Sequence, residues 1–385
     1  MRLRRPVAVG AVGVLALAGQ LLAACGGSAH SPLAAGAFEP AAPGGRAPTA
    51  VEAGLASVND TADSRAFLEW GNLAEIRSVI RRDRPKWELL GGMGAGALVE
   101  LPVSLKAFTG VDLHTVSTGT TVGGGLNLAV RLTGPGIQAA RVTGALERHG
   151  ARRQGRFLTL GKAGSGISDF RRGYGLLDRS IAGTGYVALG RTDRAAAAAA
   201  GGGKPLTDDP LYAAAGACLG NALWAIVLPA SRLGGTPSNE LLALGGLAPG
   251  SDRHPPVEEV CLIDRSAARI AAQAARLRRT LAPSSPFPNP GAAVLGGASS
   301  RLTVPIRHYV SAADVQRDAI GGVYADRATL TTPGYAAFLF IALQGNAIGE
   351  LYATRCTAGL IDPGLPPGRL AALCRAIGLE PPSKP

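Results

Sequence analysis

Cysteines are the residues of this chain best suited to chemistry, and only five occur in its 385 positions. Four of them lie in the second half of the chain, an even number that suits an oxidising compartment and allows three disulfide pairings. The sequence favours bonds between neighbours on either side of a Pro-rich stretch, with free buried thiols as the alternative. The favoured pairs are Cys218–Cys261 and Cys356–Cys374.

The fifth cysteine, Cys25, follows a different kind of sequence. Residues 1–24 begin with three arginines, continue as an apolar run and end in small residues, which is the order of a secretory signal peptide. The segment Leu22-Ala23-Ala24-Cys25 resembles the lipobox of bacterial lipoproteins. That resemblance implies cleavage before Cys25, a diacylglyceryl group on its thiol and a further acyl chain, such as palmitate, on its amine.

An uncleaved transmembrane anchor is the alternative for this segment, because residues 6–24 are nearly uncharged and long enough to span a bilayer. Three glycines and Gln20 make that span a poor one. Two or three acyl chains provide stable membrane attachment. We therefore expect the rest of the chain to lie on the extracytoplasmic side.

The chain is strongly basic, with a formal net charge of +12 at pH 7. Such a balance favours polyanionic partners, although a GC-rich genome also produces many arginines without selection for binding. For an exported protein the polyanion would be a lipid headgroup layer or a wall polymer, and nucleic acid is expected only for a cytoplasmic chain. We therefore expect no nucleic acid partner.

One predicted helix concentrates this positive charge. Between residues 265 and 281 the apolar side chains fall on one side and four arginines cluster opposite them: Arg265, Arg269, Arg276 and Arg279. Such a face would suit contact with an anionic lipid surface. The alternative is a solvated arginine face above an Ala/Leu contact with the core.

Patterns typical of enzymes and metal sites are missing from the sequence. The five histidines stand apart and no Cys-x-x-Cys occurs, which argues against a metal centre. Gly164-Ser165-Gly166 has the wrong spacing for a hydrolase nucleophile elbow. The glycines of 91–97 are predicted to form a turn between helices. We expect no enzyme activity, no metal and no cofactor.

Neighbouring acids give no support for catalysis by paired carboxylates. Glu258 and Glu259 are adjacent, so they would point to opposite faces of a strand. Asp208, which precedes Asp209, would cap a helix.

Hydrophobic periodicity divides the chain into a tether and a packed body. Residues 25–60 are rich in Ala, Gly and Pro and predict a flexible tether, so the body is expected to span 61–385. The predicted elements are a strand at 67–70, a helix capped by Asn72, a strand–helix–strand unit at 126–161, a strand at 186–192, an Ala-rich helix capped by Asp193, a helix at 208–220, a buried strand at 222–229, and an extended run and helix within 301–324. Residues 231–256 and 283–300 predict loops or a linker.

These elements predict an α+β fold built from strand-helix-strand units. Aligning Leu126 with Leu302 further suggests two similar lobes, divided near 231–300. The segment 335–352 is expected to belong to the core, as either helix or strand.

The chain as a whole is similar to lipoproteins of GC-rich Gram-positive bacteria, which share a lipobox, an Ala/Gly/Pro tether and an α+β body. This class carries no assigned activity, so the resemblance implies a location at the cell membrane rather than a reaction. We expect a lipid-anchored extracytoplasmic protein with a binding or structural role in the cell envelope. Its partners would be the membrane, through acylated Cys25, and an envelope protein, lipid or wall polymer. The alternatives are a solute-capture lipoprotein for a transporter and, with less support, an envelope hydrolase.

Overall fold

The computed structural model describes residues 47–87, 90–96, 98, 102–124, 127–160, 178–233, 240–248, 257–273, 307–308 and 322–331. Among the candidate site residues discussed above, Cys25, Cys356, Cys374, Arg276 and Arg279 lie outside these ranges. The segments 283–300 and 335–352 lie outside them as well.

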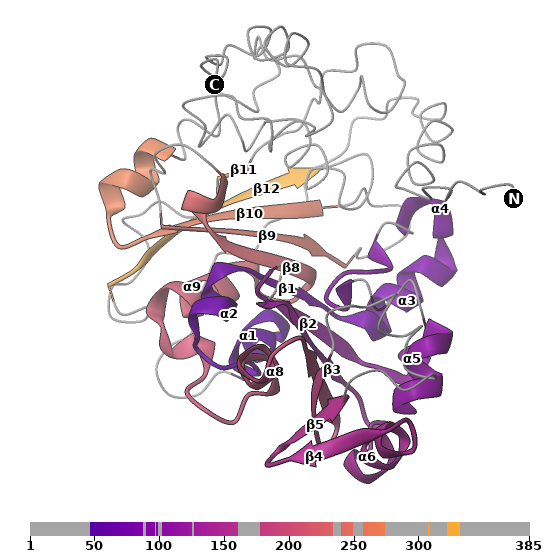
Figure 1. Ribbon diagram of the computed structural model, residues 1–385. Helices are drawn as coiled ribbons and strands as arrows, with labels where there is room; N and C mark the ends of the chain where they lie inside the picture. The colour runs from indigo at the N-terminus through magenta and orange to yellow at the C-terminus, as the bar shows by residue number, and fades with distance from the viewer. Residues whose placement is uncertain are drawn as a thin grey trace, which may run out of the picture.

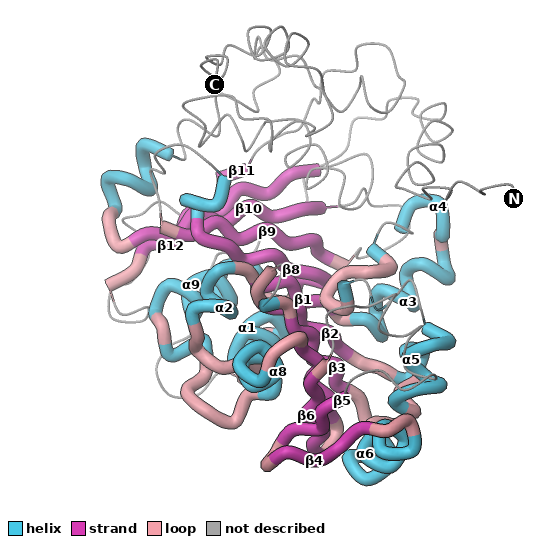
Figure 2. The backbone as a smooth tube through the Cα atoms, in the orientation of Figure 1, coloured by secondary structure: helices cyan, strands magenta, loops and turns pink. Residues whose placement is uncertain are grey.

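The described strands join into one twelve-stranded sheet whose neighbouring pairs are all antiparallel. Figures 1 and 2 show this sheet as a twisted band through the molecule, in the order β11-β12-β10-β9-β8-β1-β2-β3-β7-β6-β5-β4. The strands are β1 (Leu68–Gly71), β2 (Thr118–Val122), β3 (Ala129–Thr133), β4 (Ala151–Gln154), β5 (Phe157–Leu160), β6 (Arg179–Gly183), β7 (Tyr186–Gly190), β8 (Ala222–Pro229), β9 (Leu241–Leu247), β10 (Val257–Asp264), β11 (Arg307–His308) and β12 (Tyr324–Thr331). Together with the helices, this sheet confirms the predicted α+β class.

Helices lie on both sides of the sheet. Figure 1 shows α1, α2, α8 and α9 on one side and α3, α4, α5 and α6 on the other. The helices are α1 (Ala50–Ala56), α2 (Ala62–Ala66), α3 (Leu73–Arg82), α4 (Arg84–Trp87), α5 (Pro102–Thr109), α6 (Ala139–Arg148), α8 (Asp193–Ala200) and α9 (Pro210–Leu219), with short 3₁₀ turns η4 (Leu113–Thr115), η6 (Leu206–Asp208) and η7 (Ala230–Leu233). Residues 267–273 are also helical.

Two apolar cores hold these layers together. The larger core combines side chains of β1 and β8–β10 with side chains of α1, α8 and α9. The smaller core lies between β3, β5 and β7 and the helices α5 and α6. Burying apolar side chains of this size stabilises the fold by about 2 kcal/mol each.

The first predicted helix forms as its sequence indicates. The Asn72 side chain accepts a hydrogen bond from the backbone N–H of Glu75 at 3.2 Å, which caps α3. The buried residues Leu73, Ile76 and Val79 recur at helical spacing and lie on one face. The strand that precedes this helix is β1, so the prediction of a strand and a capped helix is confirmed.

The unit at 126–161 is also confirmed, with one addition. Strand β3 turns its alternate residues Val130 and Leu132 into the smaller core, and α6 ends at Arg148, shortly before Gly150, whose φ of 87° favours glycine. The strand expected after this helix is a hairpin, β4–β5. His149 sits at the C-cap of α6.

Two predicted helix caps are displaced by one residue. Thr192, not Asp193, caps α8, because its hydroxyl accepts the backbone N–H of Ala195. Asp209, not Asp208, caps α9, because Pro210 occupies the first helical position that its fixed φ favours.

The strand order repeats itself on the two sides of the β1–β8 pair. In the first half β1, β2 and β3 lie side by side, and the last strand, β7, returns next to β3 with β6 beyond it. In the second half β8, β9 and β10 lie side by side, and the last strand, β12, returns next to β10 with β11 beyond it. The hairpin β4–β5 is the addition to the first half.

This repeat differs from the one expected. Aligning Leu126 with Leu302 equates β3 with β11, whereas the strand order equates β3 with β10. Strands β9 and β10 lie within the region 231–300 and pair with β8 and β12 in the continuous sheet. The predicted loop at 231–256 is wrong over β9, whose first six residues are buried.

The tether predicted over 25–60 is too long at its C-terminal end. Helix α1 begins at Ala50, and its N-terminus is capped by a capping box between Thr49 and Glu52. Its residues Val51 and Leu55 are fully buried in the larger core. The packed body therefore includes α1 rather than starting at residue 61.

The glycines of 91–96 form the expected turn and pack directly on the sheet. A Cβ atom on Gly94 would lie 2.3 Å from the backbone nitrogen of Gly71 in β1 and 2.4 Å from the carbonyl oxygen of Gly119 in β2. Gly94 also has a φ of 81°, which side chains rarely adopt. Three glycines thus allow the backbone of the turn to approach the backbone of two strands closely.

Replacing Gly94 by Ala should therefore destabilise the protein by about 3 kcal/mol, because the methyl group clashes with backbone and the φ is strained. Urea unfolding followed by circular dichroism would measure the loss. Gly124→Ala is the matched control, since a Cβ there meets open space. Equal stabilities for the two variants would contradict the packing described.

Candidate functional site

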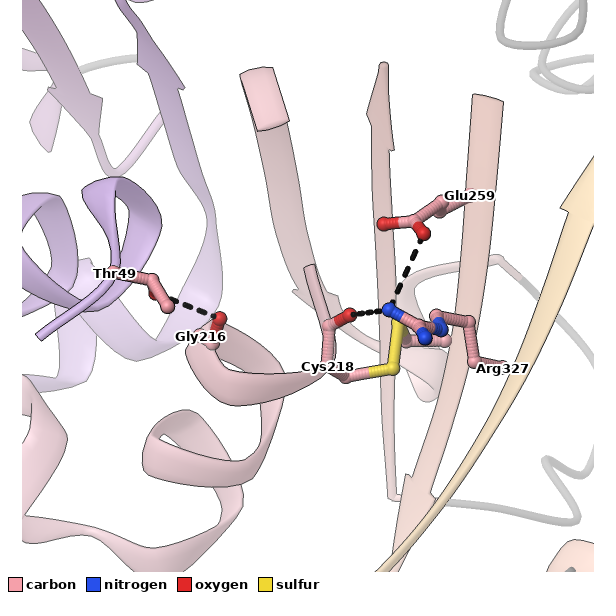
Figure 3. The surroundings of a disulfide bond; sticks show 6 residues. Thr49, Gly216, Cys218, Glu259 and Arg327 are labelled. Atoms are coloured by element: carbon pink, nitrogen blue, oxygen red, sulfur yellow. Dashed lines mark hydrogen bonds and ion pairs between the residues drawn. A yellow bond between two sulfur atoms is a disulfide. The ribbon is translucent and has the colours of Figure 1, made fainter. Parts of the chain in front are cut away.

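A disulfide bond lies where α9 packs on the second half of the sheet. Cys218 of α9 and Cys261 of β10 are joined across a Cα–Cα distance of 6.3 Å, and both side chains are fully buried. Figure 3 shows this bond between the end of the helix and the middle of the strand. It is the first of the two pairings that the sequence favours.

An ion pair lies beside the disulfide. Arg327 of β12 is the direct cross-strand neighbour of Cys261, so both side chains project from the same face of the sheet. Its guanidinium lies 3.3 Å from the Glu259 carboxylate and donates a hydrogen bond to the carbonyl oxygen of Cys218 at 3.2 Å. Figure 3 shows the Arg327 side chain between these two groups. One cation thus links β10, β12 and the end of α9.

Burial controls the electrostatics of this cluster. Glu259 is only 4% exposed, and its removal from water raises the pKa of its carboxyl group to about 7, although the charge of Arg327 acts in the opposite direction. The charged carboxylate is therefore costly to keep inside the protein. Arg327 is the cation that lowers this cost.

The sequence positions these groups through small residues. Gly216 of α9 lies against α1, since a Cβ there would meet Glu52 at 2.9 Å. The Thr49 hydroxyl donates to the carbonyl oxygen of Gly216 at 3.4 Å, as Figure 3 shows. Helix α9 is thus held between α1 on one side and the disulfide on the other.

Two of the four arginines predicted to face an anionic surface pair with acids of the chain. Arg265 bridges Glu240 and Asp209, the latter at 3.6 Å. Arg269 bridges Glu240 at 3.6 Å and Asp264 at 2.7 Å, and these contacts raise the pKa of its guanidinium. Both side chains remain about half exposed. Contact with an anionic surface stays a prediction for this face.

The same run of ion pairs continues to α2. Arg65 lies 3.0 Å from Asp209 and 2.5 Å from Asp60, which also pairs with Lys204 at 3.1 Å. The Tyr212 hydroxyl donates to the carbonyl oxygen of Arg65 at 2.6 Å. Alternating charges therefore connect the first half of the chain to the helix at 267–273.

A further acid, partly buried, lies beside the Gly-rich turn. Glu69 of β1 accepts the backbone N–H of Gly94 at 2.6 Å, and burial raises the pKa of its carboxyl group despite this hydrogen bond. Its strand neighbours are Thr121 and Ile226, neither of which is charged. The part of the chain that the structure describes holds no set of three His, Cys, Asp or Glu side chains able to bind a metal ion.

The Glu259–Arg327 pair was not predicted from the sequence. Its partners are 68 positions apart, and β12 was not recognised as a strand. The available signal was Val257–Asp264, where two glutamates interrupt an otherwise apolar run around a cysteine. The expectation that Glu258 and Glu259 point to opposite faces agrees with their position in β10.

Comparisons with known proteins add no assignment. No family model matches the chain, and neither the curated proteins nor the solved structures gave a match. None of the helices in the described ranges has the length and hydrophobicity that a bilayer span requires.

Removing the disulfide should lower stability by about 4 kcal/mol, because it closes a loop of 43 residues in the unfolded chain. Cys218→Ala combined with Cys261→Ala should show this loss in urea unfolding under oxidising conditions. Peptide mapping without reductant should find the two cysteines linked in the parent chain. Separate, unlinked peptides would contradict the pairing.

The pH dependence of stability should carry the signature of Glu259. A glutamate titrates near 4.5 in the unfolded chain and near 7 in this fold, so stability should fall as pH rises through that interval, by at most about 3 kcal/mol. Glu259→Gln should flatten this fall in thermal melts between pH 4 and 8.

Glu147→Gln, at an exposed position of α6, is the control and should keep the slope of the parent protein. A fall in Glu259→Gln as steep as in this control would contradict the assignment.

Proposed function

We propose that the chain is a lipoprotein attached to the cell membrane through acylated Cys25, with its body on the extracytoplasmic side and a binding or structural role in the envelope. The observation that carries the proposal is the buried Cys218–Cys261 disulfide. Disulfides persist in oxidising compartments and are rare in the cytosol. The bond therefore supports the location that the signal-peptide order and the lipobox resemblance imply.

A binding or structural role is supported by how the polar groups of the body are used. Arg327, which is partly buried, joins two strands and a helix, and the ion pairs from Asp60 to Asp264 join α2 to the helix at 267–273. These interactions hold elements together.

Changing Cys25 tests the anchor. Cys25→Ser should release the body from the membrane fraction or leave an uncleaved precursor, because serine lacks the thiol that takes the diacylglyceryl group. Membrane fractionation with mass spectrometry of the N-terminal peptide would measure both.

The matched control is the Cys218→Ala, Cys261→Ala variant, which keeps Cys25 and should stay in the membrane fraction. A Cys25→Ser product that is still cleaved and membrane-bound would refute the anchor.

A further inference from the structure

The end of the sheet opposite β11 is strongly basic. There the hairpin β4–β5 lies beside α6, as Figures 1 and 2 show. Residues 139–160 contain five arginines against a single acid, Glu147. These arginines, here named the basic tip, are all exposed: Arg141, Arg148, Arg152, Arg153 and Arg156.

The basic tip is not neutralised by the described part of the chain. None of its five guanidinium groups forms an ion pair or a hydrogen bond there, and the contact found is Arg156 over the Phe157 ring at 5.2 Å. Arginines elsewhere, such as Arg65 and Arg179, pair with carboxylates. The charge of the tip is thus available to a partner.

The fold spreads these charges around an edge. Strand β4 is the last strand of the sheet, and its successive residues Arg152 and Arg153 point to opposite faces. Arg141 and Arg148 are two turns apart on α6, so they share one side of that helix. A surface laid across the edge of the sheet would meet cations from both faces of β4 and from α6.

We infer that the basic tip binds the phosphate headgroups of an anionic lipid bilayer, with the β4 edge against the membrane. This inference rests on the extracytoplasmic, lipid-anchored location proposed above. Guanidinium groups bind phosphate through paired hydrogen bonds, and basic side chains are attracted to anionic bilayers. Headgroups diffuse laterally, so a bilayer can match cations that are irregularly spaced on two faces and a helix.

The chain between the anchor and the body is long enough for this contact. About 24 residues separate Cys25 from α1, and a stretch of that length can extend to at most about 80 Å. From β1 to β4 the sheet is about 29 Å wide, given six strand spacings. The anchor and the basic tip can therefore reach the same membrane.

Charged side chains on an edge strand also have a simpler use, which is to prevent pairing between the sheets of two molecules. The α6 arginines separate the two roles. Arg141 and Arg148 lie outside the edge strand, so edge protection does not require them, whereas membrane contact does.

Vesicle sedimentation tests the inference with the chain from residue 25 to 385 carrying Cys25→Ser, which has no lipid of its own. It should bind vesicles rich in phosphatidylglycerol, should not bind phosphatidylcholine vesicles, and should be released by about 0.5 M salt. Arg152→Gln with Arg153→Gln should lower the partition coefficient about tenfold, and Arg141→Gln with Arg148→Gln should do the same.

The matched control is Arg81→Gln with Arg191→Gln, which makes the same change in net charge away from the tip. Its partition coefficient should lie within about twofold of that of the parent chain, since local rather than total charge determines contact with the vesicle. Gel filtration of each variant shows whether it remains monodisperse. If the β4 variant, Arg152→Gln with Arg153→Gln, aggregates, the α6 variant, Arg141→Gln with Arg148→Gln, tests membrane binding.

Three results would overturn the inference. They are no binding of the parent chain to phosphatidylglycerol vesicles, an equal loss in the control, or binding to soluble poly(glycerol phosphate) without binding to vesicles, which would identify a wall polymer as the partner. Because the assayed chain is unlipidated, failure here would leave the Cys25 fractionation result standing.

Discussion

The constraint on which this structure depends is the burial of strands β8, β9 and β10 on both faces. Nearly every residue of these strands is removed from water, including Glu258 and Glu259. Backbone groups in such strands need ladder partners on both sides, and buried carboxylates need compensating charge. The positions of β1 and β12 beside these strands supply ladder partners, and Arg327 supplies the compensating charge for Glu259.

The same constraint explains why the two halves form one body. If β8 were an edge strand, its backbone would be exposed on one side; pairing with β1 removes that edge and makes the sheet continuous. The run of ion pairs from α2 to the helix at 267–273 crosses the same boundary on the surface. The repeated strand order therefore belongs to one continuous sheet.

Local signals in the sequence predicted the helices better than the strands. Helix α3 carries its cap and its apolar spacing within ten residues, and α9 followed by β8 is recognisable from one uncharged run. Strands β9 and β10 were missed because residues buried on both faces show no alternation. In β9, Gly245 and Gly246 indicate a loop, yet a Cβ on Gly246 would meet the Trp224 ring at 2.2 Å, so packing against that ring requires glycine.

Contacts between distant segments were the least predictable part of the site. The Cys218–Cys261 bond could be chosen because few cysteines limit the number of pairings. Arg327 gave no comparable signal, since its role depends on β12 returning next to β10 after about 60 intervening residues. Helix α1 was hidden by its Ala and Gly content, which suits close contact with α9 as well as it suits a linker.

The way α1 meets α9 also determines how the body would respond to mechanical tension. The Thr49 hydroxyl, the Ala50 N–H and the Val51 N–H are bonded to Gly216, Asn221 and Gly220 respectively, all at the end of α9. Any pull on the chain from its N-terminal side first reaches these bonds. From α9 the covalent link between Cys218 and Cys261 passes the force into β10, where two full hydrogen-bond ladders share it. A body held from this side is therefore loaded at an interior strand of its sheet and not at an edge strand that could peel away.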